Sequence, residues 1–337
     1  MRHSAVTYSQ QIAALLAESE NASLPWDVLF CTDMLGLAEF RGLCPEPVRQ
    51  LPAIIYFHEN QLTYPTQQDD ERDFHFAYSN MTSALAADRV WFNSAYHRDE
   101  FLTALRTLLH RMPNFGHEEA VDDILSKSKI QHPGIDVPQP QRSAADSKAR
   151  TPGPLRIVWA SRWEHDKNPE LFFEAISELA TLNVAFELSV LGQSFRHSPP
   201  CFEEARHQLA SHIRHWGYAE TRADYLRILS ESDVVVSTAR HEFFGISIVE
   251  AVAAGCRPLV PRALAYPETL GAESGCFHDG TARGIAKALA DSAAGLENAT
   301  GATESSTQNV LKNFAQFTWP SRSSQLDAAI DKLVEDN

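Results

Sequence analysis

Two glutamates, Glu242 and Glu250, stand in the segment best suited to chemistry, STARHEFFGISIVEAVAAGCRPLVP at residues 237–261. Glu242 falls on a predicted loop, and Gly245 permits a tight turn before a helix expected over residues 246–254. The free N–H groups at a helix start carry a partial positive charge that favours phosphate. Two carboxylates beside such a site suit a ligand with phosphate and vicinal hydroxyls, as in a sugar nucleotide. The spacing alone leaves open a solvated loop glutamate and a salt-bridged helix glutamate.

Two cations, Arg162 and Lys167, follow a predicted strand at residues 155–160. In a turn at the carboxyl end of a strand they can clamp a diphosphate from two sides. Such a clamp stabilises the negative charge that develops on a departing phosphate. The alternative is two surface cations, one of them paired with Glu164 or Asp166.

A dense set of hydrogen-bonding side chains follows the apolar strand predicted at residues 53–57. Donors and acceptors gathered at the end of a buried strand indicate hydroxyl recognition in a cleft. The alternative is a solvated loop in which Asp73 caps a helix. The set consists of His58, Glu59, Asn60, Gln61, Glu71, Arg72, Asp73 and His75.

The motif R-x4-K followed by EFFGISIVE resembles the donor site of retaining GT-B glycosyltransferases of family 4. By this resemblance Arg162 and Lys167 bind the donor diphosphate. Glu242 binds the sugar hydroxyls and Glu250 the nucleotide ribose. The implied donor-binding set is Arg162, Lys167, Glu242, Phe244, Gly245, Ile246 and Glu250.

Three strings of the first half resemble the tRNA-queuosine α-mannosyltransferase family: AIIYFHENQLTYP, ERDFHFAY and WFNSAYHRDEFL. The similarity covers nearly the whole chain. It implies a hexosyltransferase that moves mannose from GDP-mannose, with retention, to the cyclopentene diol of queuosine in a tRNA anticodon loop. His58 matches the histidine that family 4 enzymes place beside the donor sugar. Glu59, Asn60, Gln61, Glu71, Arg72 and Asp73 are the acceptor-side candidates.

The mechanism implied by the resemblance is front-face displacement, in which the departing phosphate oxygen helps to take the acceptor proton. Most of the catalysis is then positioning and charge stabilisation. We expect His58, Arg162, Lys167 and Glu242 to be catalytic. Because the two cations take the place of a metal ion, we expect neither a metal nor a cofactor beyond the donor.

Three departures from the family patterns stand out. Ser161 occupies a position where glycine is usual, and Asn168 follows Lys167, although the charged groups remain. Family members usually open with a strand and a glycine-containing loop before the region that resembles RHSAVTYSQQIAALL. We therefore expect a first domain short of its first strand, with Met1 an internal methionine. A family 4 enzyme acting on a lipid, metabolite or nucleoside, and a non-catalytic sugar-nucleotide-binding protein, are the alternatives.

Short apolar runs alternate with helical patterns along the chain, which predicts parallel sheets covered on both faces. Strands are expected at 27–32, 53–57, 89–92, 129–131, 155–160, 185–191, 213–217, 233–237 and 257–260. Helices are expected at 6–19, 74–87, 95–109, 169–180, 201–210 and 246–254, with a final amphipathic segment at 321–334.

The fold class implied is α/β, of GT-B type, with two Rossmann-like doubly wound domains facing a central cleft. The predicted domains are 1–137 on the acceptor side, a linker at 138–154, a nucleotide-sugar-binding domain at 155–310 and a helical segment at 311–337. This last segment resembles the helix that crosses back to the first domain in GT-B enzymes. Two domains joined in this way place the ligand beyond the carboxyl ends of the strands.

The composition limits the kinds of partner that this protein can bind. The 337 residues carry 44 acidic against 29 basic side chains, a net charge of −15, which excludes a broadly basic surface. A local arginine-bearing rim remains possible for tRNA; the first half holds Arg2, Arg41, Arg49, Arg72, Arg89, Arg98, Arg106 and Arg111. Five scattered cysteines and the absence of any bilayer-length apolar stretch favour a cytoplasmic protein. His207, His212 and His215 lack partners at metal-ligand spacing, so no metal is predicted there.

Overall fold

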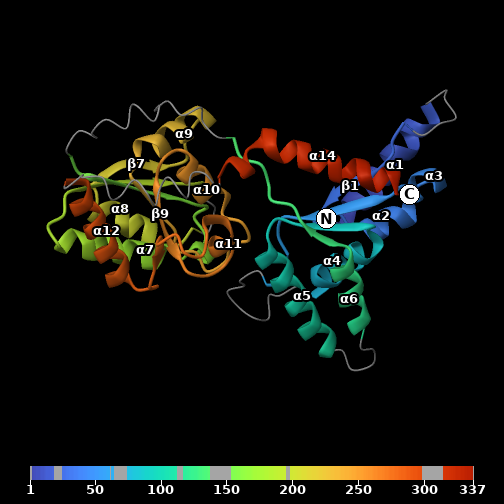
Figure 1. Ribbon diagram of the computed structural model, residues 1–337, viewed down its shortest axis with the longest axis horizontal. Coiled ribbons are helices and arrows are strands. Elements are labelled where there is room, and N and C mark those ends of the chain that lie inside the picture. Colours follow the sequence, from blue (N-terminus) through green and yellow to red (C-terminus); the bar gives the residue numbers. More distant parts are fainter. Residues whose placement is uncertain are drawn as a thin grey trace. The chain divides into compact units, whose positions relative to one another are not determined.

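The computed structural model describes residues 2–18, 25–60, 62–63, 74–111, 117–136, 153–194, 198–297 and 314–336. They form two compact units, each described here by itself: Met1–Pro133 with Arg322–Asn337, and Gly134–Ser321. Each unit is built on a parallel sheet, which confirms the α/β prediction (Figure 1). The predicted linker lies outside the described residues except for Gly153 and Pro154.

The sheet of the first unit has four parallel strands in the order β1-β2-β3-β4. They are β1 (Leu29–Thr32), β2 (Ala53–Phe57), β3 (Arg89–Phe92) and β4 (Ser128–Ile130). Every residue of β2 is buried, as expected for a parallel strand with both faces covered. β1 begins two residues later than its apolar pattern suggests, and β4 is displaced by one residue from the predicted position.

Helices cover both faces of this sheet. Right-handed connections between strands in consecutive order place their helices on one face, where Phe40, Met81 and Phe101 share a core with Ile55 and Phe92 of the sheet. On the other face Ile54, Tyr56 and Trp91 pack against Leu333 of the last helix. The helices are α1 (Arg2–Glu18), α2 (Leu37–Leu43), α3 (Glu46–Arg49), α4 (Phe74–Ala86), α5 (Ala95–His110), α6 (Glu118–Ser126) and α14 (Trp319–Glu335), of which α14 joins this unit from Arg322 onward.

The sheet of the second unit has six parallel strands in the order β10-β9-β8-β5-β6-β7. They are β5 (Leu155–Ala160), β6 (Phe186–Leu191), β7 (Ile213–Gly217), β8 (Val234–Val236), β9 (Arg257–Pro261) and β10 (Phe277–His278). β10 has only two residues, too few for its alternation to be recognised in the sequence. The strand order reverses between β5 and β8, which is the switch point at which open α/β sheets bind ligands.

Two layers of helices cover this second sheet. On one face Phe172, Phe202 and Leu289 belong to a common core; on the other, Leu229 and Val249 do so. The elements are η2 (His165–Lys167), α7 (Pro169–Thr181), α8 (Cys201–Gln208), α9 (Arg222–Glu231), α10 (Ile246–Ala253), α11 (Tyr266–Leu270), α12 (Ala282–Glu297) and η3 (Ala315–Phe317). The sequence pattern did not predict α9, α11 or α12.

In both units an aspartate links the amino ends of two neighbouring strands through a pair of hydrogen bonds. Asp88, just before β3, donates its N–H to the Ala53 carbonyl at 2.8 Å and accepts the Ala53 N–H on Oδ2 at 2.8 Å. Asp233, just before β8, has the same two-way pairing with Arg156, also at 2.8 Å in each direction. The Arg156 guanidinium adds two bonds to the Asp233 carboxylate at 3.2 and 3.0 Å. Each carboxylate thus fixes the register of two adjacent strands.

None of the helices that the structure describes is long and apolar enough to cross a membrane. The five cysteines are free. Burial raises the pKa of Cys31 and of Cys201 to about 12, so these two thiols stay protonated and weakly nucleophilic.

The aspartate pairing makes a prediction about stability. Asp233→Asn should lower the free energy of unfolding by about 2 kcal/mol, because an amide cannot hold the half-buried Arg156 guanidinium and the strand N–H together. Hydrogen exchange in peptides that cover β5 and β8 measures the loss. The matched control is Asp224→Asn, which removes an exposed pair with Arg227 and should leave exchange unchanged. Equal exchange in the two variants would contradict the assignment.

Candidate functional site

The switch point of the second unit brings the two predicted motifs together. Arg162 and Lys167 follow β5, and Glu242 follows the adjacent strand β8. Asn168 has a φ of 50°, in the left-handed region that asparagine tolerates better than most residues. It turns the chain from η2 into α7, which explains why asparagine follows Lys167.

The Lys167 ammonium links the two loops. It donates to the His241 carbonyl at 2.8 Å, and its Nζ lies 2.9 Å from Asp166 Oδ2 and 3.3 Å from Glu242 Oε2. Burial lowers the pKa of Lys167, but the negative charges of Glu242 and Asp166 outweigh it, so the pKa is raised above its usual value. The ammonium therefore remains charged throughout the physiological pH range.

Arg162 lies at the exposed rim of this site. Its Nε is 3.3 Å from Oε2 of the half-buried Glu164. The pairing with Glu164 or Asp166 that the sequence left open therefore exists for both cations, because Lys167 also contacts Asp166. Three carboxylates, counting Glu242, surround the two cations.

The start of α10 combines a left-handed glycine turn with one buried and one exposed side chain. Gly245 has a φ of 83°, and a Cβ there would come within 2.8 Å of the Tyr266 ring. Ile246, the first helical residue, is 47% exposed. Phe244 points into the core, with its ring 5.4 Å from that of Phe317. Of the predicted donor contacts Phe244, Gly245 and Ile246, only the Ile246 side chain is therefore exposed.

Glu250 is buried and already engaged. Its Oε1 accepts a hydrogen bond from Arg222 at the start of α9, and Tyr225 also hydrogen-bonds to it. Burial and the Glu250 charge raise the pKa of Tyr225, so its hydroxyl stays a donor. A carboxylate offers about four acceptor positions, so room for a diol remains. Arg222 and Tyr225 escaped the sequence analysis because a lone Arg-x-x-Tyr carries no recognisable signal.

A polar network braces the loop that carries Glu242. The Ser237 hydroxyl lies 2.7 Å from the Tyr266 hydroxyl, and the Ser237 carbonyl lies 2.9 Å from His278 Nε2. Thr238 donates to the main-chain carbonyls of Asn168 at 2.9 Å and Lys167 at 3.0 Å. These bonds join the ends of β5, β8 and β10. They are long-range contacts of ordinary residues, which the local pattern does not reveal.

In the first unit the peptide of His58 is held from both sides. Its N–H donates to Asp33 Oδ1 at 3.0 Å, and its carbonyl accepts from Asn93 Nδ2 at 3.0 Å. Asp33 follows β1 and Asn93 follows β3, the two neighbours of the strand that ends before His58. Burial lowers the pKa of His58 despite the charge of Glu59, so the imidazole is neutral at pH 7. Asp33 and Asn93 are positioning residues that the sequence analysis missed.

The remaining acceptor-side candidates divide into described and undescribed residues. Glu59 is half-buried, and Asn60 is buried with its side-chain oxygen accepting from the Thr63 N–H at 3.1 Å and hydroxyl at 3.2 Å. Asn60 thus caps a turn in this structure. Gln61, Glu71, Arg72 and Asp73 lie outside the described residues.

The arginines proposed for a first-unit rim are mostly paired with carboxylates. Only Arg111 among those whose side chains the structure describes has no such partner within 4.0 Å. The pairs are Arg41–Asp88, Arg49–Glu46, Arg89–Asp336, Arg98–Asp99 and Arg106–Asp122.

Two of the three clustered histidines of the second unit, His212 and His215, are partly buried. The ring of His212 stacks on Phe186 at 4.1 Å, and burial lowers the pKa of His215. In the described part of the chain no group of three or more His, Cys, Asp or Glu side chains could hold a metal ion.

Two family models match this chain. Residues 1–135 match tRNA-queuosine alpha-mannosyltransferase N-terminal, and residues 141–302 match Glycosyl transferases group 1. A tRNA-queuosine alpha-mannosyltransferase of Drosophila melanogaster is 35% identical over 246 residues, 72% of this chain and 65% of that protein. A GDP-mannose-dependent alpha-(1-6)-phosphatidylinositol dimannoside mannosyltransferase of Mycobacterium tuberculosis is 26% identical over 217 residues, 63% of this chain and 51% of that protein. The chain thus spans less than two thirds of either relative.

Solved structures support the fold. A sucrose-phosphate synthase of Thermosynechococcus elongatus aligns with a TM-score of 0.70 at 15% identity, covering 98% of this chain and 78% of that one. HepE of Anabaena, solved with UDP, aligns with a TM-score of 0.69 at 15% identity, covering 96% and 82%. These neighbours confirm the predicted GT-B fold. Residues 1–135 are thus similar to the tRNA-queuosine alpha-mannosyltransferase family, and residues 141–302 to the group 1 glycosyltransferases.

Proposed function

We propose that this protein is a retaining mannosyltransferase that moves mannose from GDP-mannose to queuosine in a tRNA anticodon loop, in the cytoplasm. The observation that carries the proposal is the buried, permanently charged Lys167 between Glu242 and Asp166 at the switch point. The match of residues 1–135 to the tRNA-queuosine alpha-mannosyltransferase model supports the acceptor. The name of the Drosophila relative supports both the sugar and the tRNA.

The contacts of Lys167 suggest how a donor enters the site. An ammonium has three donors; Lys167 donates to the His241 carbonyl and to Glu242, and forms an ion pair with Asp166. The contact with Glu242 is the longest of the three, at 3.3 Å. A diphosphate oxygen therefore takes the place of Glu242 on the ammonium, with Arg162 gripping the diphosphate from the rim. Glu242 is then released to accept hydrogen bonds from the sugar hydroxyls.

The reaction proceeds on one face of the sugar. The bond from the anomeric carbon to the phosphate oxygen breaks, the bond to a queuosine hydroxyl forms, and the hydroxyl proton passes to the departing phosphate oxygen. Lys167 and Arg162 stabilise the charge that develops on that phosphate. Neutral His58, fixed by Asp33 and Asn93, positions the sugar near the anomeric centre. Glu250 holds the ribose diol.

A transfer assay tests the proposal. The protein is incubated with GDP-mannose and tRNA that carries queuosine, and nucleosides from the digested tRNA are analysed by mass spectrometry. We expect mannosylated queuosine, no product from the same tRNA with guanosine in place of queuosine, and an undiminished rate in EDTA. Donor hydrolysis without tRNA modification would indicate a different acceptor. Binding of GDP-mannose without any turnover would indicate a non-catalytic protein.

Removal of the rim cation tests the diphosphate clamp. Arg162→Ala should lower turnover by about 10²-fold while leaving the fold intact, because it removes a donor aimed at developing charge. Arg214→Ala is the matched control, since Arg214 pairs with Glu187 and Glu231 on the exposed side of β7. Normal turnover of Arg162→Ala in a steady-state assay would refute the clamp.

The pH dependence of the reaction tests His58. The pKa of His58 in the folded protein lies below the usual 6.5. The ring therefore stays neutral until the pH falls below this lowered pKa. We expect kcat/KM to be flat through neutral pH and to fall on the acid side as His58 gains a proton. His58→Asn should lower activity and abolish the His58 part of this fall. An unchanged acid limb in that variant would show that another group titrates.

A further inference from the structure

Three neighbouring strands of the second unit each deliver an arginine to the same edge of the sheet. Arg162 follows β5, Arg240 follows β8 and Arg262 follows β9. These strands are adjacent in the order β9-β8-β5, and the carboxyl ends of parallel strands lie on one edge. The N–H of Arg240 donates to the Asp166 carbonyl at 2.8 Å, so its loop adjoins that of β5. In an acidic chain this is a local row of positive charge.

Two of these arginines are not neutralised. Arg240 and Arg262 are exposed, and neither has a carboxylate oxygen within 4.0 Å among the described residues. The nearby acids have other partners: Glu164 contacts Arg162, and Asp166 and Glu242 contact Lys167. This contrasts with the first unit, where most of the arginines are paired.

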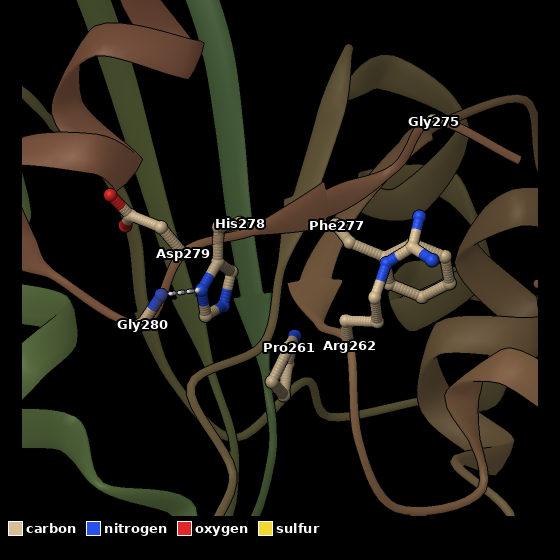
Figure 2. Close-up of a pocket in the computed structure, with 7 residues that line it drawn as sticks. All are labelled: Pro261, Arg262, Gly275, Phe277, His278, Asp279 and Gly280. Atoms are coloured by element: carbon tan, nitrogen blue, oxygen red, sulfur yellow. Dashed lines mark hydrogen bonds between the residues drawn. The ribbon is translucent and has the colours of Figure 1, made fainter. Parts of the chain in front are cut away.

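Arg262 also forms the rim of a cavity of about 560 Å³ at the ends of β9 and β10. Figure 2 shows its guanidinium over the Phe277 ring, and the carbon of the guanidinium lies 4.9 Å from the ring centroid. The His278 ring is fixed between the Ser237 carbonyl and the Gly280 N–H, and burial lowers its pKa, so it adds no charge. The Asp279 carboxylate points away from Arg262 and accepts hydrogen bonds from Thr281.

We propose that this arginine edge binds single-stranded RNA of the tRNA substrate. The guanidinium of Arg262, supported by Phe277, stacks on an unpaired base that enters the cavity, and Arg240 contacts a backbone phosphate. A flat guanidinium beside a cavity suits RNA with splayed bases, because a duplex keeps its bases stacked and out of reach. The inference rests on the proposed tRNA acceptor and names the surface that holds it.

Fluorescence anisotropy with labelled queuosine-containing tRNA, measured over a series of NaCl concentrations, tests the surface. Arg262→Ala should weaken binding about tenfold through the loss of stacking. Arg240→Ala should reduce the slope of log affinity against log salt by about 0.7, the value for one phosphate contact on a single strand, whereas Arg262→Ala, which removes a base stack, should leave that slope unchanged. The affinity for GDP-mannose, measured by calorimetry, should not change.

Two further variants sharpen the test. Arg262→Lys keeps the positive charge but replaces the planar guanidinium with a compact ammonium. It should therefore keep the salt slope and lose the affinity that stacking supplies. Arg257→Ala is the matched control, because Arg257 begins the same strand, β9, at the opposite edge of the sheet. It should bind tRNA as the unmodified protein does.

The outcomes separate this inference from the proposed function. The double variant Arg240→Ala/Arg262→Ala gives the first outcome. If it mannosylates tRNA normally, with unchanged tRNA affinity and salt slope, the arginine edge is refuted and the proposed function stands. Polyglutamate carries negative charge but has no bases. If it displaced labelled tRNA as well as unlabelled tRNA does, base stacking would be refuted. Binding of GDP-mannose by the unmodified protein without any affinity for tRNA would refute the acceptor and the surface together.

Discussion

The geometry of the second unit depends on one buried ammonium. Lys167 joins the loop after β5 to the loop after β8 through Asp166, Glu242 and the His241 carbonyl. A charge buried this deeply is tolerated only when carboxylates compensate it. The two loops must therefore fold together, because neither can bury its charged groups alone. The bonds from Thr238 to the main chain at Lys167 and Asn168 complete the junction.

The sequence predicted those parts of the fold that local patterns encode. Continuous apolar runs such as β2 and β5 were located to the residue, and β8 to within one residue at each end, because parallel strands must be apolar on both faces. Arg162, Lys167 and Glu242 were recognised from charge and spacing. The partners Arg222, Asp33 and Asn93 were not, because each acts through a long-range hydrogen bond that leaves no periodic trace. Local sequence patterns thus identify the charged groups, whereas only the tertiary structure identifies the residues that position them.

Net charge proved a poor guide to where charge acts. The chain carries −15 overall, yet Arg240 and Arg262 leave positive charge on one edge of the second sheet. In the first unit the arginines that the composition suggested as a basic rim mostly serve the fold: Arg41, for example, ties Asp88 to the carbonyls of Ala86 and Leu51. An arginine count cannot distinguish these roles, because pairing is decided by neighbours in space.

The paired aspartates before β3 and β8 have a consequence for where each sheet tolerates change. Each uses one carboxylate and one N–H to fasten the amino ends of two strands. The residues proposed to contact substrates leave the opposite, carboxyl ends. Because the two edges are separated by the length of the strands, a mutation in a carboxyl-edge loop does not touch the aspartate pairing that fixes the register. Substitutions there, outside the junction of Lys167, Glu242 and Thr238, can therefore change substrate contacts while the strand register stays constant. The two edges of each sheet therefore have separate tasks: the amino edge fixes the strand register, and the carboxyl edge carries the residues proposed to contact substrates.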